Sequence, residues 1–280
     1  MTDYEFVGNN SNAFLVGQPD DPTWKNAQKH RQNITVMLGR IAKQGAKSLC
    51  VFGAGPCNDI DLKVLCALFG QVTLVDIDSE TLKQGVSKQQ ASNLANLELL
   101  DGVDLFGATK VLRSYGQSKD ESLMDGIFQA VTGHEIPQLG TYDCVASTCL
   151  LSQLLCQVSN AMDVSHARFV DALTAIRSRH LNLMKSALNP GGHALLITDV
   201  VSSDSLPELL KEDVNLQETL RAAIARKNFF HGLNPAALSN MMTDKELASE
   251  ITSFSISEPW RWVAPMRTYC CFAIKFVRSL

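Results

Sequence analysis

The sequence contains no long hydrophobic run. No stretch approaches the roughly 18 consecutive apolar residues of a membrane-spanning helix, and the acidic start Met1–Glu5 does not resemble a secretory signal. The eight cysteines include no Cys-x-x-Cys pair and show no metal-binding spacing. We therefore expect a cytoplasmic protein in a reducing compartment, with no membrane partner and no metal site.

Clustered positive charge is also scarce. The chain has 25 Lys and Arg residues against 29 Asp and Glu residues, a net charge of −4. Its densest basic stretch, residues 221–227, fits the solvated face of a helix. Because contact with a phosphate backbone needs clustered basic side chains, we expect no nucleic-acid partner.

Apolar runs and amphipathic segments alternate along the chain, without internal repeats or a low-complexity linker, so we expect a single domain over residues 1–280. Strands are expected at 48–52, 72–77, 97–100, 142–146 and 193–200, and helices at 24–44, 62–69, 79–91 and 164–188. A turn at 189–192 should precede the fifth strand. Two last runs, at 251–257 and 269–277, predict an antiparallel C-terminal hairpin. The fold class is therefore α/β, a doubly wound, mostly parallel seven-stranded sheet with helices on both faces.

The strongest local signal is Gly53-Ala54-Gly55, directly after the first predicted strand. Glycine at such a position lets the backbone approach a ligand closely. A dinucleotide site would have a third glycine at position 58, where the helix N-terminus receives the pyrophosphate. Here Asn58 stands at that position and Asp59 follows. The extra carboxylate opposes an anionic cofactor and suits a ligand that carries an ammonium and a sulfonium group.

A second acidic signal follows the second predicted strand. Asp76 lies about twenty residues after Gly55, the spacing at which a carboxylate accepts hydrogen bonds from ribose hydroxyls. NAD-dependent enzymes share this feature, so Asp76 indicates an adenosine-type ligand without distinguishing the two classes. Asp78 is better explained as a turn residue.

A series of segments, in order, resembles the motifs of class I S-adenosylmethionine-dependent methyltransferases of the small-molecule type. They are Gly53–Pro56 with Asp59, then Asp76, Asp104-Leu105, Tyr142–Ser147 and Leu188–Leu195. The match covers about residues 30–200, and the C-terminal hairpin suits the same fold. The resemblance implies S-adenosylmethionine as the cofactor and methyl transfer to an O, N, S or C atom of a small-molecule acceptor. The Asn/Asp-Pro-Pro-Tyr motif with which amino-type nucleic-acid methyltransferases grip a flipped base does not follow the fourth strand.

The resemblance also implies which residues hold the cofactor. The glycine loop would hold the methionine part, Asp76 the ribose and Asp104 the adenine amino group, and the segment after strand four would line the methionine side. The implied cofactor-binding residues are Gly53, Ala54, Gly55, Asn58, Asp59, Asp76, Ile77, Asp104, Leu105, Ser147 and Thr148.

The catalytic candidates are Asp199 and His231. Asp199 lies at the carboxyl end of the fifth strand, where open α/β sheets bind ligands, although a capping or turn role would also place it there. His231 lies in a helical insert expected over residues 201–250. A methyltransferase must place the acceptor in line with an already electrophilic methyl group, and it needs a base only if the acceptor is protonated.

Two aromatic-bearing segments are expected to cover the acceptor site as a lid: an N-terminal arm at residues 1–23 and the insert at 201–250. Trp260 and Trp262 fit a pocket wall, hairpin packing or both. Two other functions stay open. A nicotinamide-dependent oxidoreductase shares the Gly-x-Gly and the acid but should have the third glycine. A methyltransferase-like binding module without catalysis is disfavoured by the intact loop and acids.

Overall fold

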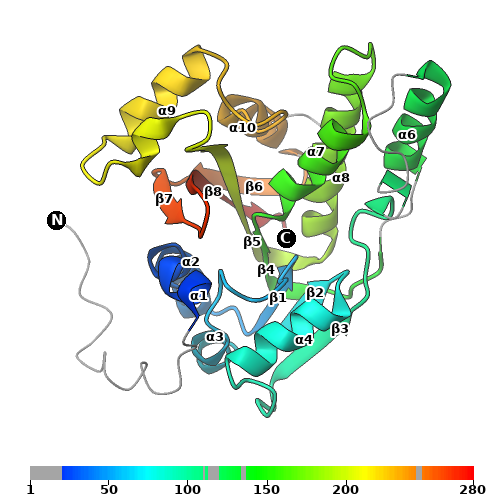
Figure 1. Ribbon diagram of the computed structural model, residues 1–280. Coiled ribbons are helices and arrows are strands. Elements are labelled where there is room, and N and C mark those ends of the chain that lie inside the picture. Colours follow the sequence, from blue (N-terminus) through cyan, green and yellow to red (C-terminus); the bar gives the residue numbers. More distant parts are fainter. Residues whose placement is uncertain (1–20, 110, 113–119, 134–136, 244–247) are drawn as a thin grey trace.

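The computed structural model describes residues 21–109, 111–112, 120–133, 137–243 and 248–280. Its centre is an eight-stranded sheet in the order β3-β2-β1-β4-β5-β8-β6, with β7 paired to β8 (Figure 1). The strands are β1 (Ser48–Phe52), β2 (Gln71–Asp76), β3 (Leu97–Asp101), β4 (Tyr142–Thr148), β5 (Leu188–Ser202), β6 (Ile251–Ile256), β7 (Trp260–Val263) and β8 (Thr268–Arg278). Strands β1 to β5 pair in parallel, and β8 runs antiparallel to its neighbours.

Helices cover both faces of this sheet. They are α1 (Pro22–Asn26), α2 (Gln28–Lys43), α3 (Leu62–Leu68), α4 (Ser79–Lys88), α6 (Glu121–Gly133), α7 (Leu150–Ala161), α8 (Phe169–Ser186), α9 (Leu216–Ala225) and α10 (Pro235–Thr243), with a short 3-10 turn η1 (Pro207–Leu210). Figure 1 shows α2, α3 and α4 on one side and α6, α7 and α8 on the other. No helix in the described ranges has both the length and the apolar character to cross a bilayer.

Alternating side chains divide the core into two apolar clusters. Leu49 and Val51 of β1 join the cluster under α2, α3 and α4. Cys50 and Phe52 are the alternate residues of the same strand and join the cluster under α6, α7 and α8. This two-sided burial is what makes the parallel strands near-continuous apolar runs, and it confirms the expected doubly wound α/β fold.

The sheet has one strand more than the seven expected. The additional strand is β7, which lies between the two runs expected to form the C-terminal hairpin. Both β6 and β7 pair with the same edge of β8, β6 along its second half and β7 along its first. The break between them is at Ser257–Pro259, where Ser257 exchanges hydrogen bonds of 2.9 Å with the backbone N and O of Ala273. Since proline donates no ladder hydrogen bond, β7 is a displaced continuation of β6 rather than a new layer.

Two other boundaries differ from the expectation. The predicted helix over 24–44 is two helices, α1 and α2, which meet at Ala27. The predicted turn at 189–192 lies inside β5, which begins at Leu188. There the register to β4 shifts, and Gly191 has φ +77°. A glycine in this conformation accommodates a bulge, so the Asn-Pro-Gly-Gly segment bends the strand instead of preceding it.

The segment expected to be an insert contains helices. Strand β5 extends to Ser202, and η1, α9 and α10 follow it. Figure 1 shows α9 and α10 near the end of β5. The predicted arm at 1–23 lies outside the described residues except for 21–23, which begin α1 through the N-cap Asp21.

Candidate functional site

A cavity of about 360 Å³ opens at the carboxyl ends of the parallel strands. The loops after β1 and β2, residues 103–106, one face of α7 and the segment after β7 line it. The order β3-β2-β1-β4-β5 reverses direction between β1 and β4. Open α/β sheets bind their ligands at such a switch point.

The two glycines of the loop after β1 have different tasks. Both have positive φ, +67° at Gly53 and +48° at Gly55. A Cβ on Gly53 would lie 2.9 Å from Leu150 at the start of α7, so Gly53 is required for packing. A Cβ on Gly55 would meet only Asp76 Oδ2, at 3.9 Å. Because Gly55 lines the cavity, that methyl group would occupy the space of a ligand.

Asp76 ties the end of β2 to this loop. Its Oδ2 accepts a hydrogen bond of 2.7 Å from the Gly55 backbone N–H, and its Oδ1 accepts one of 2.9 Å from Asp78 N–H. Each carboxylate oxygen keeps a free lone pair for a further donor. Asp78 itself caps α4 by accepting from Glu80 and Thr81, in agreement with its expected role in a turn.

Helix α4 is packed unusually close to the glycine loop. A Cβ on Gly85 would lie 2.5 Å from the carbonyl carbon of Pro56. In dinucleotide sites a third glycine of the loop allows close packing between helix and strand. Here the glycine that allows the close packing is Gly85 of helix α4 rather than a residue of the loop, so position 58 of the loop can carry a side chain.

Asn58 is held from two sides. Its side-chain oxygen accepts a hydrogen bond of 2.6 Å from Lys88, which also pairs with Asp21 at 3.1 Å. Its backbone carbonyl accepts one of 2.8 Å from Arg31. Arg31 also lies over the Trp24 ring, 3.4 Å from its centroid. These contacts fix the loop against α1, α2 and α4.

Asp59 is the unusual group of the site. It lines the cavity, yet its Oδ1 is buried without a hydrogen-bond partner and lies 3.6 Å from Nε2 of His30. Burial, assisted by the charge of Asp199, raises the pKa of Asp59 to about 7, while Arg31 opposes the shift. Asp59 therefore titrates near neutrality.

Asp199 lies on β5, is buried, and its charge acts on Asp59. Its carboxylate accepts a hydrogen bond from the Ser152 hydroxyl. Burial raises the pKa of Asp199, and the donors Ser152 and Cys149 oppose that change. The residue couples to the cavity through Asp59 and does not itself line it.

Asp104 is anchored in its own loop. Its Oδ1 accepts from Phe106 N, Gly107 N and the Thr109 hydroxyl at 2.8–3.0 Å, and its Oδ2 accepts from Thr109 N at 3.0 Å. The residue lines the cavity together with Leu105. Its Oδ2 has one donor and retains acceptor capacity toward a ligand.

The lining of the cavity is strongly acidic. Four carboxylates face it, those of Asp59, Asp76, Asp78 and Asp104. Among the lining residues that the structure describes there is no lysine, arginine or histidine. The field of such a cavity favours a cationic ligand over a phosphorylated one.

No protein-family model matches the sequence, and no curated protein matches it. Solved structures do. One is the N-methyltransferase NodS from Bradyrhizobium japonicum WM9, at 9% identity over 91% of this chain and 99% of that chain, with a TM-score of 0.45. Another is the YcgJ protein from Bacillus subtilis, at 10% identity over 89% and 99%, with a TM-score of 0.48. A third is the magnesium protoporphyrin IX methyltransferase ChlM from Synechocystis PCC 6803, at 13% identity over 91% and 86%, with a TM-score of 0.46.

The fold assignment rests on the chain's own topology. Its parallel strands reverse direction at the glycine loop, its last strand is antiparallel between β5 and β6, and the carboxylate after β2 binds the loop. The chain has the class I methyltransferase fold. Within that fold Ala54 and Ile77 line the cavity beside Gly53 and Gly55.

Other predicted positions lie away from this cavity. Ser147 and Thr148 are buried and do not line it, and the Ser147 hydroxyl instead pairs with Nε2 of His180 at 2.9 Å. His231 is exposed and meets the edge of Phe169, 5.5 Å between ring centroids. The sequence indicates which segments lie near the cavity, but the direction of each side chain depends on packing.

The sequence did not identify the polar stripe of α7. Gln153 and Gln157, four positions apart and therefore on one helix face, line the cavity where Ser147 and Thr148 were expected. The Oε1 atom of Gln157 is buried without a partner. Two polar residues at helical spacing within an apolar segment were the available signal. Trp262, which the sequence left open, is part of the wall and also packs in the hairpin region.

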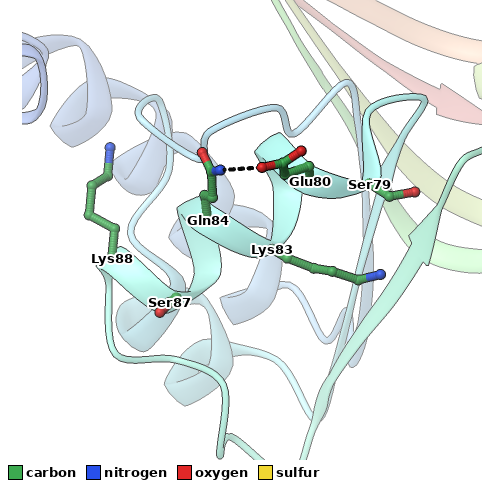
Figure 2. Close-up of a pocket in the computed structure, with 6 residues that line it drawn as sticks. All are labelled: Ser79, Glu80, Lys83, Gln84, Ser87 and Lys88. Carbon is green, nitrogen blue, oxygen red and sulfur yellow. Dashed lines mark hydrogen bonds between the residues drawn. The ribbon is translucent and has the colours of Figure 1, made fainter.

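A second hollow lies on the outer face of α4. Figure 2 shows its lining residues spread along the helix, with Gln84 donating to Glu80 at 3.0 Å. Its two lysines are engaged elsewhere, Lys83 with Asp101 and Lys88 with Asp21. It is open to solvent, and the residues that line it all belong to α4, so we do not assign a ligand to it.

Proposed function

We propose that the chain is an S-adenosylmethionine-dependent methyltransferase that acts on a small molecule. The observation that carries this proposal is the acidic cavity at the switch point of the sheet, with four carboxylates and no basic side chain among its described lining residues. A ligand with a sulfonium and an ammonium group suits this field, whereas a pyrophosphate does not. The alternative of a nicotinamide-dependent oxidoreductase is disfavoured for the same reason.

The residues present fit this cofactor. In this proposal Asp76 accepts hydrogen bonds from the ribose hydroxyls, Asp104 and Leu105 border the adenine, and Asp59 pairs with the ammonium group. Gly55 leaves room for the methionine part. When bound, the sulfonium supplies an electrophilic methyl group, so the chain has to position the acceptor and exclude water.

The insert and the segment after β7 are proposed to enclose the acceptor. Arg261 of β7 donates hydrogen bonds to the carbonyls of Leu209 and Lys211, which fixes the start of the insert to the cavity wall. Such an enclosed site suits a small molecule rather than a duplex. We propose Asp199 and His231 as candidates for a catalytic role. Asp199 is the stronger candidate because its charge acts on Asp59, which lines the cavity.

The eight cysteines are all free thiols. This agrees with a reducing compartment and supports the proposal of a cytoplasmic enzyme.

Titration calorimetry tests the cofactor assignment. We expect S-adenosylmethionine and S-adenosylhomocysteine to bind with one site per chain and NADH not to bind. Binding of NADH with no binding of either adenosyl compound would overturn the proposal in favour of the oxidoreductase.

Turnover separates an enzyme from a binding module. We expect the protein with S-adenosylmethionine and a fractionated small-molecule extract to release S-adenosylhomocysteine faster than without extract. The Gly55→Val variant is the control, because it should remove the cofactor from its site. Equal release with and without every fraction would favour the non-catalytic module.

A further inference from the structure

The buried His30 and the partly buried Trp260 form a pair beside the cavity, although they lie far apart in the sequence. The Trp260 indole Nε1 donates a hydrogen bond of 3.0 Å to Nδ1 of His30. His30 also stacks on Trp262, with 4.7 Å between ring centroids and 17° between planes. The side chain of His30 is fully buried. The ring of His30 is therefore held both by a hydrogen bond and by a stacked neighbour.

This arrangement determines which nitrogen of His30 carries the proton. An indole N–H can only donate, so Nδ1 of His30 must accept. The neutral ring then has its proton on Nε2, which faces Asp59 Oδ1 at 3.6 Å. Burial and the neighbouring Arg31 lower the pKa of His30 to about 3, so the ring stays neutral and is a fixed donor rather than a base.

The two facing atoms have no other partner. His30 Nε2 and Asp59 Oδ1 are both buried and without a hydrogen bond. At 3.6 Å the contact is longer than a hydrogen bond, and the attraction is that of an N–H dipole for a carboxylate. Because Oδ1 is buried, the exposed part of the Asp59 side chain is its cavity side.

The other groups around Asp59 act in both directions. Arg31 of α2 favours its ionised form, and Asp199 of β5 opposes it. Asp61 lies two residues further along and shares Arg31 with Asp59. Three thiols are also near Asp59: Cys57 of the same loop, Cys149 before α7 and Cys271 of β8. Burial raises the pKa of Cys57 and Cys271, and the hydrogen bond with Cys271 together with burial raises the pKa of Cys149, so the three thiols are neutral at working pH. Besides Arg31, the N–H dipole of His30 is a local feature that favours the ionised carboxylate.

We propose that His30, fixed by Trp260, is a positioning residue that keeps the Asp59 carboxylate ionised and directed into the cavity. The role of that carboxylate as the partner of a ligand ammonium group rests on the proposed function. His30 does not line the cavity and acts through Asp59.

The test is the pH dependence of S-adenosylhomocysteine affinity, measured by calorimetry from pH 5.5 to 8.5 in wild type and His30→Leu. Affinity should fall as the pH drops through the pKa of Asp59. Loss of the dipole should move this midpoint up by about one pH unit, so affinity falls about tenfold at low pH and hardly changes at pH 8.5. An unchanged midpoint would overturn the proposal.

Two further variants make the result specific. His30→Gln keeps an N–H near the Nε2 position and should restore the wild-type midpoint. His180→Leu removes another buried imidazole, the one that contacts Ser147, and should destabilise the fold without moving the midpoint. A shift in His180→Leu equal to that in His30→Leu would show a general packing effect and refute the assignment.

A measurement without ligand separates this inference from the proposed function. Nitrogen NMR of the wild-type imidazoles should find the His30 proton on Nε2, and carboxyl-carbon NMR should show a higher pKa of Asp59 in His30→Leu. These results can hold even if S-adenosylhomocysteine does not bind, in which case the proposed function alone fails. A proton on Nδ1 of His30 would overturn the inference even if the protein binds the cofactor.

Discussion

Gly53→Ala and Gly55→Ala add the same methyl group to the same loop. We expect Gly53→Ala to lose more stability and Gly55→Ala to lose more ligand affinity. Both positions have positive φ, which costs an alanine roughly 1–2 kcal/mol. At Gly53 the new Cβ would also lie 2.9–3.1 Å from three atoms of Leu150. Overpacking of this kind adds about 1–3 kcal/mol. We expect about 2–5 kcal/mol of destabilisation for Gly53→Ala and about 1–2 kcal/mol for Gly55→Ala.

Thermal unfolding checks this ranking, because each kcal/mol lowers Tm by about 2–4 °C in chains of similar size. For ligand affinity the order should reverse. Gly55→Ala places its methyl group in the cavity beside Asp76, so S-adenosylhomocysteine should bind at least about tenfold more weakly, a loss of about 1.4 kcal/mol. Gly53→Ala should retain more affinity at a temperature where it is folded.

The same scans with saturating ligand provide a second measure, since a ligand that binds only the native state raises Tm. Wild type and Gly53→Ala should both show this rise, and Gly55→Ala should show little. The reasoning is refuted if Gly55→Ala binds like wild type, or if Gly53→Ala unfolds at the wild-type temperature.

Three further predictions concern neighbours of the loop. Asp76→Ala should weaken S-adenosylhomocysteine binding by about ten- to a hundredfold in calorimetry and lower Tm, because it also orphans the Gly55 N–H. The pKa of Asp59 is raised to about 7 in the folded protein, so the fold favours the protonated carboxyl group. The free energy of unfolding should therefore fall as the pH rises from about 4 to about 7. Asp59→Asn should therefore gain on the order of 2 kcal/mol in urea unfolding at pH 8, little at pH 4, and bind ligand more weakly. Gly85→Ala should lower both Tm and affinity, because its Cβ would collide with Pro56; normal affinity would contradict the close packing of α4.

Local periodicity predicted the parallel core well. Strands β1 to β5, the glycine loop and Asp76 are features of contiguous sequence, and the structure has each near its expected position. Features set by distant partners were not predictable in this way. The close contact of Gly85 with Pro56 is visible only once α4 is packed on the loop.

The extra strand illustrates the same limit. The pairing of β7 depends on the free half of the β8 edge, and a short segment flanked by prolines is typical of a turn. Ser147 and Thr148 follow the expected strand, but the side chain of Ser147 lies toward His180 and α7 supplies the cavity wall. The sequence indicated which segments surround the site, and three-dimensional packing determines which side chains line the cavity.

Strand β8 has a consequence for how the chain must fold. It follows β6 and β7 in sequence, yet it lies between β5 and β6, and most of its residues are buried. During synthesis, β5 therefore leaves the ribosome well before the strand that pairs with its outer edge. Until then an apolar edge is exposed, which is the kind of surface that recruits other unfolded chains. Assembly of this half of the sheet is a long-range step, so its refolding should be slow and sensitive to protein concentration.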